Sequence, residues 1–245
     1  MSNPDTTTFA EVLGARLRHE PGRPLVTFYD DATGERVELS VTTYANWVAK
    51  ASSLLVDELG LEKGEGLHVD LPPHWLTTVF LGAAWNAGLV VTDAADAAAV
   101  VCGPATLPEH AGGAGERFVL ACSLLPLGVR FAEGVPDGVH DVGIEIWSQP
   151  DAFTPWDPPA GADPATALAG ASATQGEMWR AAAAGDLVPD GGRLLTVANP
   201  ASPPGLATFC EPLARGGSLV LVARTEPSRL EEIAVSEHVT ARFPV

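Results

Sequence analysis

The sequence predicts an α/β fold of layered, mostly parallel sheets flanked by helices. Its clearest unit lies between Arg193 and Val222, where the strand-like runs RLLTVANP and SLVLVA flank a helical pattern. One face of that helix is apolar at positions i, i+3, i+4 and i+7, which are Leu206, Phe209, Cys210 and Leu213. A strand, a helix and a strand at this spacing form a βαβ unit, in which the two strands run parallel. Strands and helices alternate again over residues 64–123, so the same architecture is expected there.

The chain before residue 64 predicts a helix, a β-hairpin and a second helix. The first helix is capped within Thr6–Thr8, and its apolar face comprises Phe9, Val12, Leu13 and Leu17. The runs LVTFYD and RVELS flank the turn DATGE and therefore predict a hairpin. Ser40 caps the second helix, which ends at Gly60. Its apolar face comprises Tyr44, Trp47, Val48, Ala51 and Leu55.

Short apolar runs separated by turns dominate the next part of the chain. We expect strands at GLHVDLP, LVVT, AAVVCG and RFVLACS. A helix from Pro73 to Ala87 should end at Gly88, because glycine adopts the left-handed conformation that terminates helices. AGGAGE predicts a loop, since it does not match the dinucleotide-binding pattern GxGxxG. After the loop-rich residues 124–140, VGIEIW predicts a further strand.

A proline-rich stretch divides the chain. Residues 149–164, QPDAFTPWDPPAGADP, contain five prolines, which is typical of a linker. We therefore expect a first α/β subdomain over residues 1–148, a Pro-rich linker over 149–164, and a second, truncated α/β subdomain over 165–245. Trp156, inside the linker, is expected to pack the two subdomains together.

The second subdomain is predicted to begin with the strand ATALAG. Thr174 and Glu177 form a capping box that opens a helix ending at Gly185. After the βαβ unit, Pro227 lies in the first turn of a last helix, and HVTARFPV predicts a final strand at the edge of the sheet. Since an unpaired edge strand invites pairing with another chain, a homodimer or a protein partner is an expectation.

The composition excludes several classes of partner. The net charge of −17 arises from 31 acidic and only 14 basic residues, so we expect no binding of nucleic acid or of an anionic membrane. The beginning of the chain lacks the pattern of a signal peptide, and its longest apolar run is too polar to span a membrane. Cys102, Cys122 and Cys210 are widely spaced in apolar runs, as expected for reduced core residues of a cytoplasmic protein.

Sequence motifs for common enzymatic chemistry are missing. The sequence contains no GxSxG, HExxH, Walker A or CxxC motif, and its six histidines lack metal-ligand spacing. His68 is interpreted as a core or edge residue. His74 and Asp70 are expected to form a surface pair at a strand end, with a catalytic role as the less favoured interpretation. We therefore assign no metal site, cofactor or catalytic residue.

Several stretches, taken in order, resemble the N-terminal portion of the adenylate-forming (acyl-CoA synthetase, AMP-binding) superfamily. The resemblance runs through PLVTFYDDATGERVELS and through a helix–strand–helix–strand block from Thr43 to Thr92. It resumes at GGRLLTVANPASPPGLATFCEPLARGGSLVLV and fades at LEEIAVSEHVTARFPV. Together these stretches cover well over half of the chain, whereas residues 93–162 show only a general similarity. In length and content the chain is most similar to a short actinobacterial family related to these enzymes.

The chain departs from the superfamily where ATP would bind. Those enzymes carry a Ser/Thr/Gly-rich loop ending in Pro-Lys-Gly, in which backbone N–H groups and the lysine hold the ATP phosphates. The resemblance places that loop within Ala165–Glu177, where ALAGASATQGE stands, and no lysine occurs after Lys63. The capping box of Thr174 and Glu177 explains this stretch better than a residual phosphate loop does.

A second departure concerns the acyl pocket. The superfamily has an aromatic or histidine-bearing motif between the strand and the helix of the βαβ unit, whereas ANPASPPG occupies that place here. Asn199 and Gly205 are the candidate residues to border a remaining substrate pocket, although a proline-stiffened loop is the simpler interpretation. By the same resemblance, the chain ends before the adenine-, Mg²⁺- and ribose-binding segments and before the C-terminal lid with its catalytic lysine.

These departures suggest a degenerate, truncated relative of the AMP-binding enzymes that lacks adenylation activity and is retained as a binding or interaction scaffold. Two alternatives stay open at this point. In the first, the chain is one half of a split acyl-adenylating enzyme whose other half is a separate polypeptide. In the second, it is a module that keeps only a pocket for a small acyl or nucleotide molecule.

Overall fold

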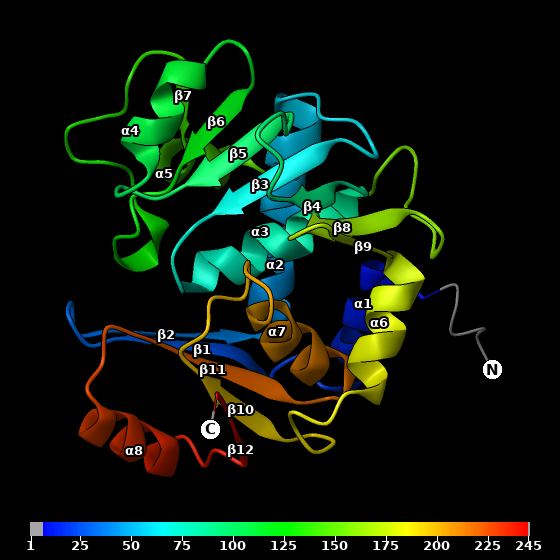
Figure 1. Cartoon of the computed structure of the whole chain (residues 1–245), viewed down its shortest axis with the longest axis vertical. Helices are drawn as coiled ribbons and strands as arrows, with labels where there is room; N and C mark the ends of the chain where they lie inside the picture. Colours follow the sequence, from blue (N-terminus) through cyan, green and yellow to red (C-terminus); the bar gives the residue numbers. More distant parts are fainter. Residues whose placement is uncertain (1–6, 245) are drawn as a thin grey trace.

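The computed structural model describes residues 7–244 and confirms an α/β fold with two sheets (Figure 1). One is a five-stranded sheet in the order β12-β10-β11-β1-β2, and the other is a seven-stranded sheet in the order β7-β6-β5-β3-β4-β8-β9. The first consists of β1 (Pro24–Asp30), β2 (Glu35–Ser40), β10 (Arg193–Thr196), β11 (Ser218–Ala223) and β12 (Ala241–Phe243). The second consists of β3 (Gly66–Asp70), β4 (Val90–Thr92), β5 (Ala99–Cys102), β6 (Phe118–Ala121), β7 (Val139–Asp141), β8 (Pro164–Leu168) and β9 (Ala171–Thr174).

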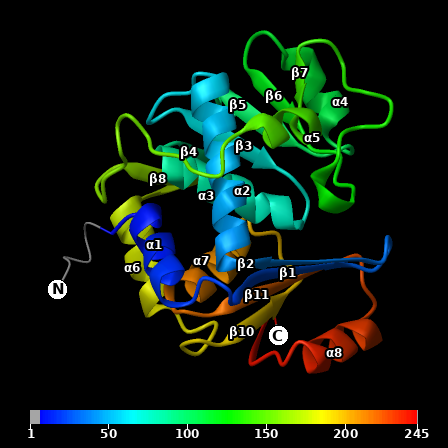
Figure 2. The same cartoon turned by 180° about the vertical axis from the view of Figure 1, so that it is seen from behind.

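The two sheets enclose a layer of helices, and each sheet carries a further helix on its outer face (Figures 1 and 2). The helices are α1 (Phe9–His19), α2 (Val41–Ser53), α3 (Trp75–Ala87), α4 (Leu107–His110), α5 (Val142–Glu145), α6 (Gln175–Ala184), α7 (Gly205–Ala214) and α8 (Pro227–Ser236). A π-helical segment, Leu54–Glu58, extends α2. α1, α2, α3 and α7 lie between the sheets, α8 covers the outer face of the five-stranded sheet, and α4 covers that of the seven-stranded sheet.

Strand β11 shows why its sequence is apolar at consecutive positions. Leu219 and Leu221 belong to the central core between the sheets, whereas Val220 and Val222 pack with Ile233 of α8 on the outer face. Successive side chains of a strand point to opposite faces, so a strand that is covered on both faces is apolar throughout. The pairings of β2 with β1 and of β9 with β8 are antiparallel, and β10 and β12 pair in parallel, as do β10 and β11.

The helix ends follow the predicted capping residues. Thr8 forms a capping box at the start of α1, Ser40 caps α2, and Gly88 ends α3 with a φ of 79°. Thr6 lies outside the described residues. The predicted strand VGIEIW is wrong, because Val142–Glu145 forms the helix α5. The carboxylate of Asp141 accepts a hydrogen bond from the backbone N–H of Gly143, which starts a helix instead.

Both sheets combine strands from distant parts of the chain. β1 and β2 join the sheet of β10–β12, whereas β8 and β9 extend the sheet of β3–β7. Each sheet therefore contains strands from both sides of the Pro-rich stretch, residues 149–164, at which the sequence was predicted to divide. Trp156, expected to pack two subdomains together, is 96% exposed, so that prediction is wrong.

Ion pairs, rather than Trp156, hold the Pro-rich stretch against the protein. Lys50 Nζ lies 3.1 Å from Asp151 Oδ1, and Lys63 Nζ lies 2.8 Å from Asp157 Oδ2. Lys50 and Lys63 are the only lysines in the sequence, so both are engaged by this stretch.

The three cysteines have free thiols and are buried, as predicted. Within residues 7–244, no helix combines the length and apolarity that a membrane crossing requires. β12 lies at the edge of the five-stranded sheet, also as predicted.

A buried amide side chain joins three helices in the centre of the molecule. Gln175 Oε1 accepts hydrogen bonds from the backbone N–H of Phe9 (3.0 Å) and from Trp179 Nε1 (3.2 Å). Its Nε2 donates to the carbonyl oxygen of Trp85 (2.8 Å). The rings of Phe9, Trp85 and Trp179 surround it, with centroids 5.6–6.0 Å apart. One side chain thus links the start of α1, the end of α3 and the start of α6.

We expect Gln175→Leu to destabilise the protein by at least about 2 kcal/mol. The substitution leaves two buried N–H groups without a partner, and each such loss costs about 1–3 kcal/mol. The carbonyl of Trp85 keeps the hydrogen bond that it accepts from the N–H of Gly88. Urea-induced unfolding measures the change. Gln149→Leu is the matched control, because Gln149 is also buried but its side-chain amide bonds to no described residue. Equal losses in the two variants would contradict the role given to Gln175.

A second buried polar group fixes α8 against the five-stranded sheet. Glu237 accepts hydrogen bonds from Tyr29, Arg36 and Arg193, and its side chain is only 10% exposed. Burial alone would raise the pKa of Glu237, but these hydrogen bonds hold it below its ordinary value. A carboxylate with a lowered pKa stabilises the folded state above the pKa of the unfolded chain, and this contribution is lost as the pH falls.

We therefore expect Glu237→Gln to lower the free energy of unfolding by about 2 kcal/mol at neutral pH, since charge-assisted hydrogen bonds are lost. The difference from the unmodified protein should shrink as the pH falls below the ordinary glutamate pKa of 4.5. Urea unfolding at neutral and acidic pH measures it. Glu231→Gln, at an exposed carboxylate paired with Arg242, should change little at either pH. A difference for Glu237→Gln that is independent of pH would refute the assignment.

Candidate functional site

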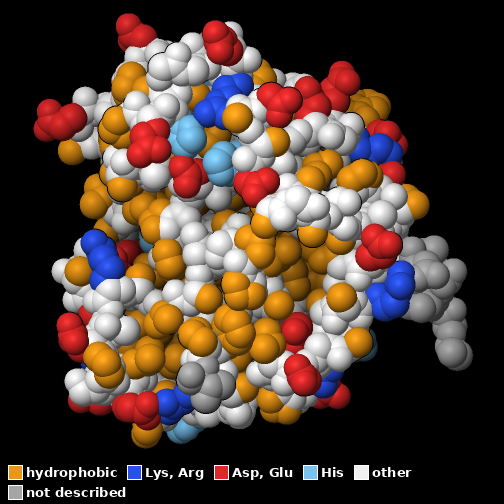
Figure 3. Space-filling model, in the orientation of Figure 1, with side chains coloured by type: hydrophobic (Ala, Val, Ile, Leu, Met, Phe, Trp, Pro, Cys, Tyr) orange, Lys and Arg blue, Asp and Glu red, His pale blue; other side chains and the backbone are white. Residues whose placement is uncertain are grey.

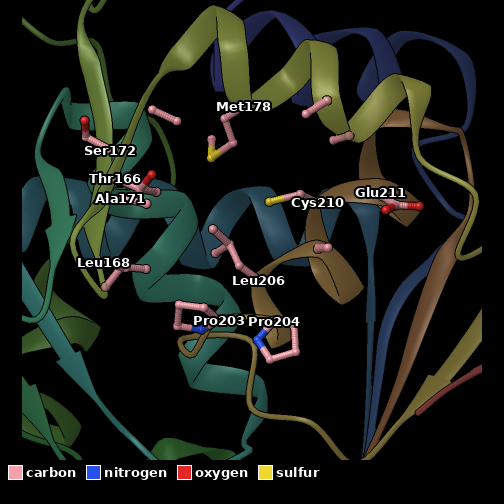
Figure 4. A pocket seen from close by; sticks show the side chains of 14 residues that line it. Thr166, Leu168, Ala171, Ser172, Met178, Pro203, Pro204, Leu206, Cys210 and Glu211 are labelled. Atoms are coloured by element: carbon pink, nitrogen blue, oxygen red, sulfur yellow. The ribbon is translucent and has the colours of Figure 1, made fainter.

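An apolar cleft opens between the β8–β9 hairpin, α6 and α7 (Figure 4). Its volume is about 420 Å³. Leu168 and Ala171 line it from the hairpin, Met178 from α6, and Leu206 and Cys210 from α7. On the same face of the molecule, apolar side chains gather over the region between the hairpin and α7 (Figure 3). We call this the acyl-side cleft, because it lies beside the segment that the resemblance assigned to an acyl pocket.

The hairpin that forms one wall lies in the stretch, Ala165–Glu177, to which the resemblance assigned the phosphate loop. Leu168 pairs with Ala171, so only Ala169 and Gly170 connect β8 to β9. Both connecting residues have positive φ, 50° and 78°, as in a type I′ turn. A two-residue turn of this kind has no flexible stretch of backbone that could wrap around phosphate groups.

The residues after the hairpin are occupied by structural contacts. Thr174 Oγ1 accepts a hydrogen bond from the N–H of Glu177, and Glu177 Oε2 accepts one from the N–H of Thr174, which confirms the predicted capping box. Between them lies Gln175, whose side chain binds α1 and α3. Residues 171–177 therefore form a strand, the start of a helix and a hydrogen-bonded contact in the core.

The two candidate pocket residues, Asn199 and Gly205, are not among the residues that line the acyl-side cleft. Asn199 donates a hydrogen bond to the carbonyl of Leu71 (2.7 Å) and accepts one from the N–H of Ala201. Gly205 is buried at the start of α7, where a Cβ atom would lie 1.9 Å from the carbonyl oxygen of Asn199. The two residues thus fix the loop that carries Pro203 and Pro204, which do line the cleft.

The cleft offers little polar chemistry. Burial raises the pKa of the Cys210 thiol, so this group stays protonated and is a poor nucleophile. Burial also raises the pKa of Glu211, whose carboxylate accepts a hydrogen bond from the N–H of Leu187. Glu211 is the one charged residue among the described residues that line the cleft.

The sequence predicted some of the residues that line this cleft, but as the apolar face of a helix and not as part of a binding site. Leu206 and Cys210 were predicted as the apolar face of α7, and that face also forms the cleft floor. Leu168, Ala171 and Met178 were not predicted, because they meet the residues of α7 only in the folded protein, where the β8–β9 hairpin and α6 lie around the same cleft. Their common signal is the apolar character of both walls, which alone does not distinguish a cleft from a core.

The predicted surface pair of His74 and Asp70 is wrong. His74 is buried, and its Nδ1 accepts a hydrogen bond from the N–H of Leu76. Asp70 pairs instead with His110 of α4, at 2.6 Å between Oδ2 and Nε2, and His110 also contacts Arg117. Among residues 7–244, no group of His, Cys, Asp and Glu side chains has the arrangement of a metal site.

Comparison with solved structures shows the fold. An acyl-CoA synthetase from Brucella canis superposes with a TM-score of 0.82 and 17% sequence identity, over 98% of this chain and 48% of the other. A Mycobacterium tuberculosis fatty acyl CoA synthetase gives a TM-score of 0.71 at 16% identity, over 95% and 48%. An anthranilate CoA ligase in complex with anthranoyl-AMP gives 0.75 at 12% identity, over 98% and 49%. The chain thus has the fold of the N-terminal half of acyl-CoA synthetases and spans about half the length of those structures.

Comparison with curated sequences shows the family. No protein-family model matches the sequence. A TIGR03089 family protein of Mycobacterium tuberculosis is 38% identical over 248 residues, which cover 96% of this chain and 97% of that protein. At this identity and coverage the chain belongs to the TIGR03089 family.

Proposed function

We propose that the protein is a binding scaffold without adenylation activity, which holds an apolar, acyl-type molecule in the acyl-side cleft. The observation that carries this proposal is the two-residue turn at Ala169 and Gly170. By the resemblance, this turn lies in the stretch where acyl-CoA synthetases carry the loop that binds the phosphates of ATP.

Electrostatics also disfavour triphosphate binding beside the hairpin. Binding of phosphate groups requires N–H donors and positive charge. Lys50 and Lys63 form ion pairs with the Pro-rich stretch, and the charged residue at the acyl-side cleft is the acid Glu211. The chain as a whole carries a net charge of −17. A triphosphate in the acyl-side cleft would therefore meet the carboxylate of Glu211, and no Lys or Arg is among the described residues that line the cleft.

The ligand class follows from the walls of the cleft. A volume of about 420 Å³ lies within the usual range of small-molecule sites. Leucine, alanine, methionine and proline side chains form the walls, so transfer of apolar surface from water supplies the binding free energy. The similarity to a fatty acyl CoA synthetase and to a ligase that holds anthranoyl-AMP supports an acyl-type molecule.

The turn also counts against a split acyl-adenylating enzyme. A separate polypeptide can supply a lid and a catalytic lysine. It cannot restore the phosphate loop, because that loop belongs to the half of the enzyme to which this chain corresponds. The scaffold proposal therefore explains the turn more directly.

We expect the purified protein to catalyse no carboxylate-dependent exchange of pyrophosphate with ATP. The physical reason is the two-residue turn in place of a phosphate-holding loop, together with the lack of a Lys or Arg among the described residues that line the acyl-side cleft. The assay uses aliphatic and aromatic carboxylic acids, with the Brucella canis acyl-CoA synthetase as the positive control. Exchange above the protein-free background would refute the loss of adenylation.

We expect decanol to raise the melting temperature of the protein, and Ala181→Trp to abolish this rise. Ala181 lies on α6, is exposed and lines the acyl-side cleft, so an indole ring there fills the ligand's space. A ligand that binds only the native state stabilises it by mass action.

Ala184→Trp is the control for the added indole ring, because Ala184 is exposed on the same helix but does not line the cleft. It should leave the decanol-induced rise intact. If Ala181→Trp keeps the full rise, or if decanol causes none in the unmodified protein, the acyl-side cleft is not the ligand site.

A further inference from the structure

A second and larger cleft lies where strands of both sheets end, and we propose that it binds an uncharged, apolar molecule through a single carbonyl oxygen. Its volume is about 740 Å³. Phe28, Pro72, His74, Leu124 and Arg224 are among its lining residues, whereas the acyl-side cleft is lined by a different set. This proposal therefore concerns a separate site and does not rest on the acyl-side cleft.

The topology places the carboxyl ends of parallel strands around this cleft. Its lining includes Asp30 at the end of β1, and segments that follow β3, β5, β6, β10 and β11. In open α/β sheets, ligands bind in the crevice outside the carboxyl ends of the strands. Here two sheets contribute such ends to one cleft, which we call the strand-end cleft.

His74 provides the polar group that points to a ligand. Its side chain is only 3% exposed and lines the strand-end cleft. Nδ1 accepts the hydrogen bond from Leu76, so Nε2 carries the proton of the neutral ring. Nε2 has no hydrogen-bond partner among the described residues, and a buried donor without a partner is costly. A carbonyl oxygen in the cleft would satisfy it.

The charges around His74 favour an uncharged ligand. Burial lowers the pKa of His74 to about 3, so the ring is neutral at physiological pH. Arg224 at the mouth of the cleft donates two hydrogen bonds to the carboxylate of Asp30, which compensates its charge. The donor of His74 is neutral, the cation of Arg224 is paired with Asp30, and the chain has a net charge of −17. An anionic ligand therefore gains little electrostatic interaction energy from binding in this cleft.

The remaining hydroxyl groups of the strand-end cleft are used within the protein. Ser123 donates to the carbonyl of Val129, Thr33 to the carbonyl of Asp30, and Thr225 to the carboxylate of Asp31. Unlike these hydroxyl groups, Nε2 of His74 has no hydrogen-bond partner among the described residues. One acceptor atom on the ligand is sufficient to satisfy it.

The rest of the wall is apolar, and two of its residues hold an unusual backbone conformation. Leu125 and Val197 are 43% and 42% exposed, so apolar surface faces solvent here. Leu124 and Arg224 have φ of 57° and 52°. Residues other than glycine adopt such angles at an energetic cost, and strained residues cluster at functional sites. An apolar ligand that covers Leu125 and Val197 accounts for the apolar surface that faces solvent here.

Three probes of similar size test the proposal with the full chain. Acetophenone has a neutral carbonyl, benzoate has a charged acceptor, and ethylbenzene has no acceptor. We expect acetophenone to shift the backbone amide resonances of Ala105, Leu124 and Thr225 in a saturable titration. Benzoate and ethylbenzene should bind at least about tenfold more weakly, which corresponds to about 1.4 kcal/mol. Equal affinity for the three probes, or no saturable shift with acetophenone, would overturn the proposal.

Two variants locate the binding. Ala105→Trp places an indole ring at an exposed position that lines the strand-end cleft, so it should abolish the acetophenone titration. Ala181→Trp, which fills the acyl-side cleft, should leave it unchanged. The reverse result would place the probe in the acyl-side cleft and overturn this proposal. Failure of decanol to bind, with acetophenone still bound, would instead affect only the proposed function.

Nitrogen-15 resonances of the His74 ring provide a readout that needs no substitution of this helix-capping residue. Nε2 should remain protonated and Nδ1 unprotonated as the pH falls from about 7 to about 5, because the pKa of the buried ring is lowered. Acetophenone should shift Nε2, and ethylbenzene should not. A ring that becomes charged near its ordinary pKa of 6.5, or one that responds equally to both probes, would contradict the assignment.

Discussion

The hydrogen bonds of the buried Gln175 amide constrain the centre of this protein. They connect α1, α3 and α6, which come from three distant parts of the chain. The apolar layer between the sheets can close only when these helix ends meet, because Phe9, Trp85 and Trp179 pack around the same amide. A polar network that satisfies all of its members fixes one arrangement of a core that apolar packing alone would specify less strictly.

This constraint extends to the segment on either side of Gln175. Before Gln175, β9 pairs with β8 through a two-residue hairpin turn. The capping box formed by Thr174 and Glu177, which lie on either side of Gln175, starts α6. The strand, the amide and the cap leave no residue of the stretch free for a flexible loop. The fold of the N-terminal half of acyl-CoA synthetases is thus compatible with a stretch, residues 171–177, that contacts other parts of the same chain.

Local patterns in the sequence predicted most of the fold, because helix caps and strand periodicity act over a few residues. Thr8, Ser40 and Gly88 end or begin helices as expected, and the helix face of Leu206 and Cys210 is present. One error overlooked a local helix cap, and another depended on a contact between distant parts of the chain. Helix α5 begins because Asp141 caps it, although VGIEIW alternates like a strand. Asp70 meets His110 only after α4 folds back over β5, which no spacing along the chain reveals.

The candidate site was less predictable for the same physical reason. A cleft is a gap between elements that do not pack fully against one another. The apolar residues of its walls have the same sequence pattern as core residues. Asn199 and Gly205 were predicted to border a pocket by their position in the βαβ unit, whereas their contacts in the structure support the loop that carries Pro203 and Pro204. His74 was expected at the surface, whereas the strand-end cleft becomes visible only when both sheets are assembled.

Under the proposed function, the two-residue turn between β8 and β9 explains how this fold can persist without phosphate chemistry. Loops at the carboxyl ends of strands carry function but contribute little to the core, so a short turn in place of such a loop leaves the sheets intact. A two-residue turn also lowers the entropic cost of closing the connection between β8 and β9. Stability that a flexible binding loop would reduce is therefore retained at the edge of the seven-stranded sheet. The acyl-side cleft beside the turn keeps its apolar walls, because α6 and α7 are held by core contacts and not by the loop.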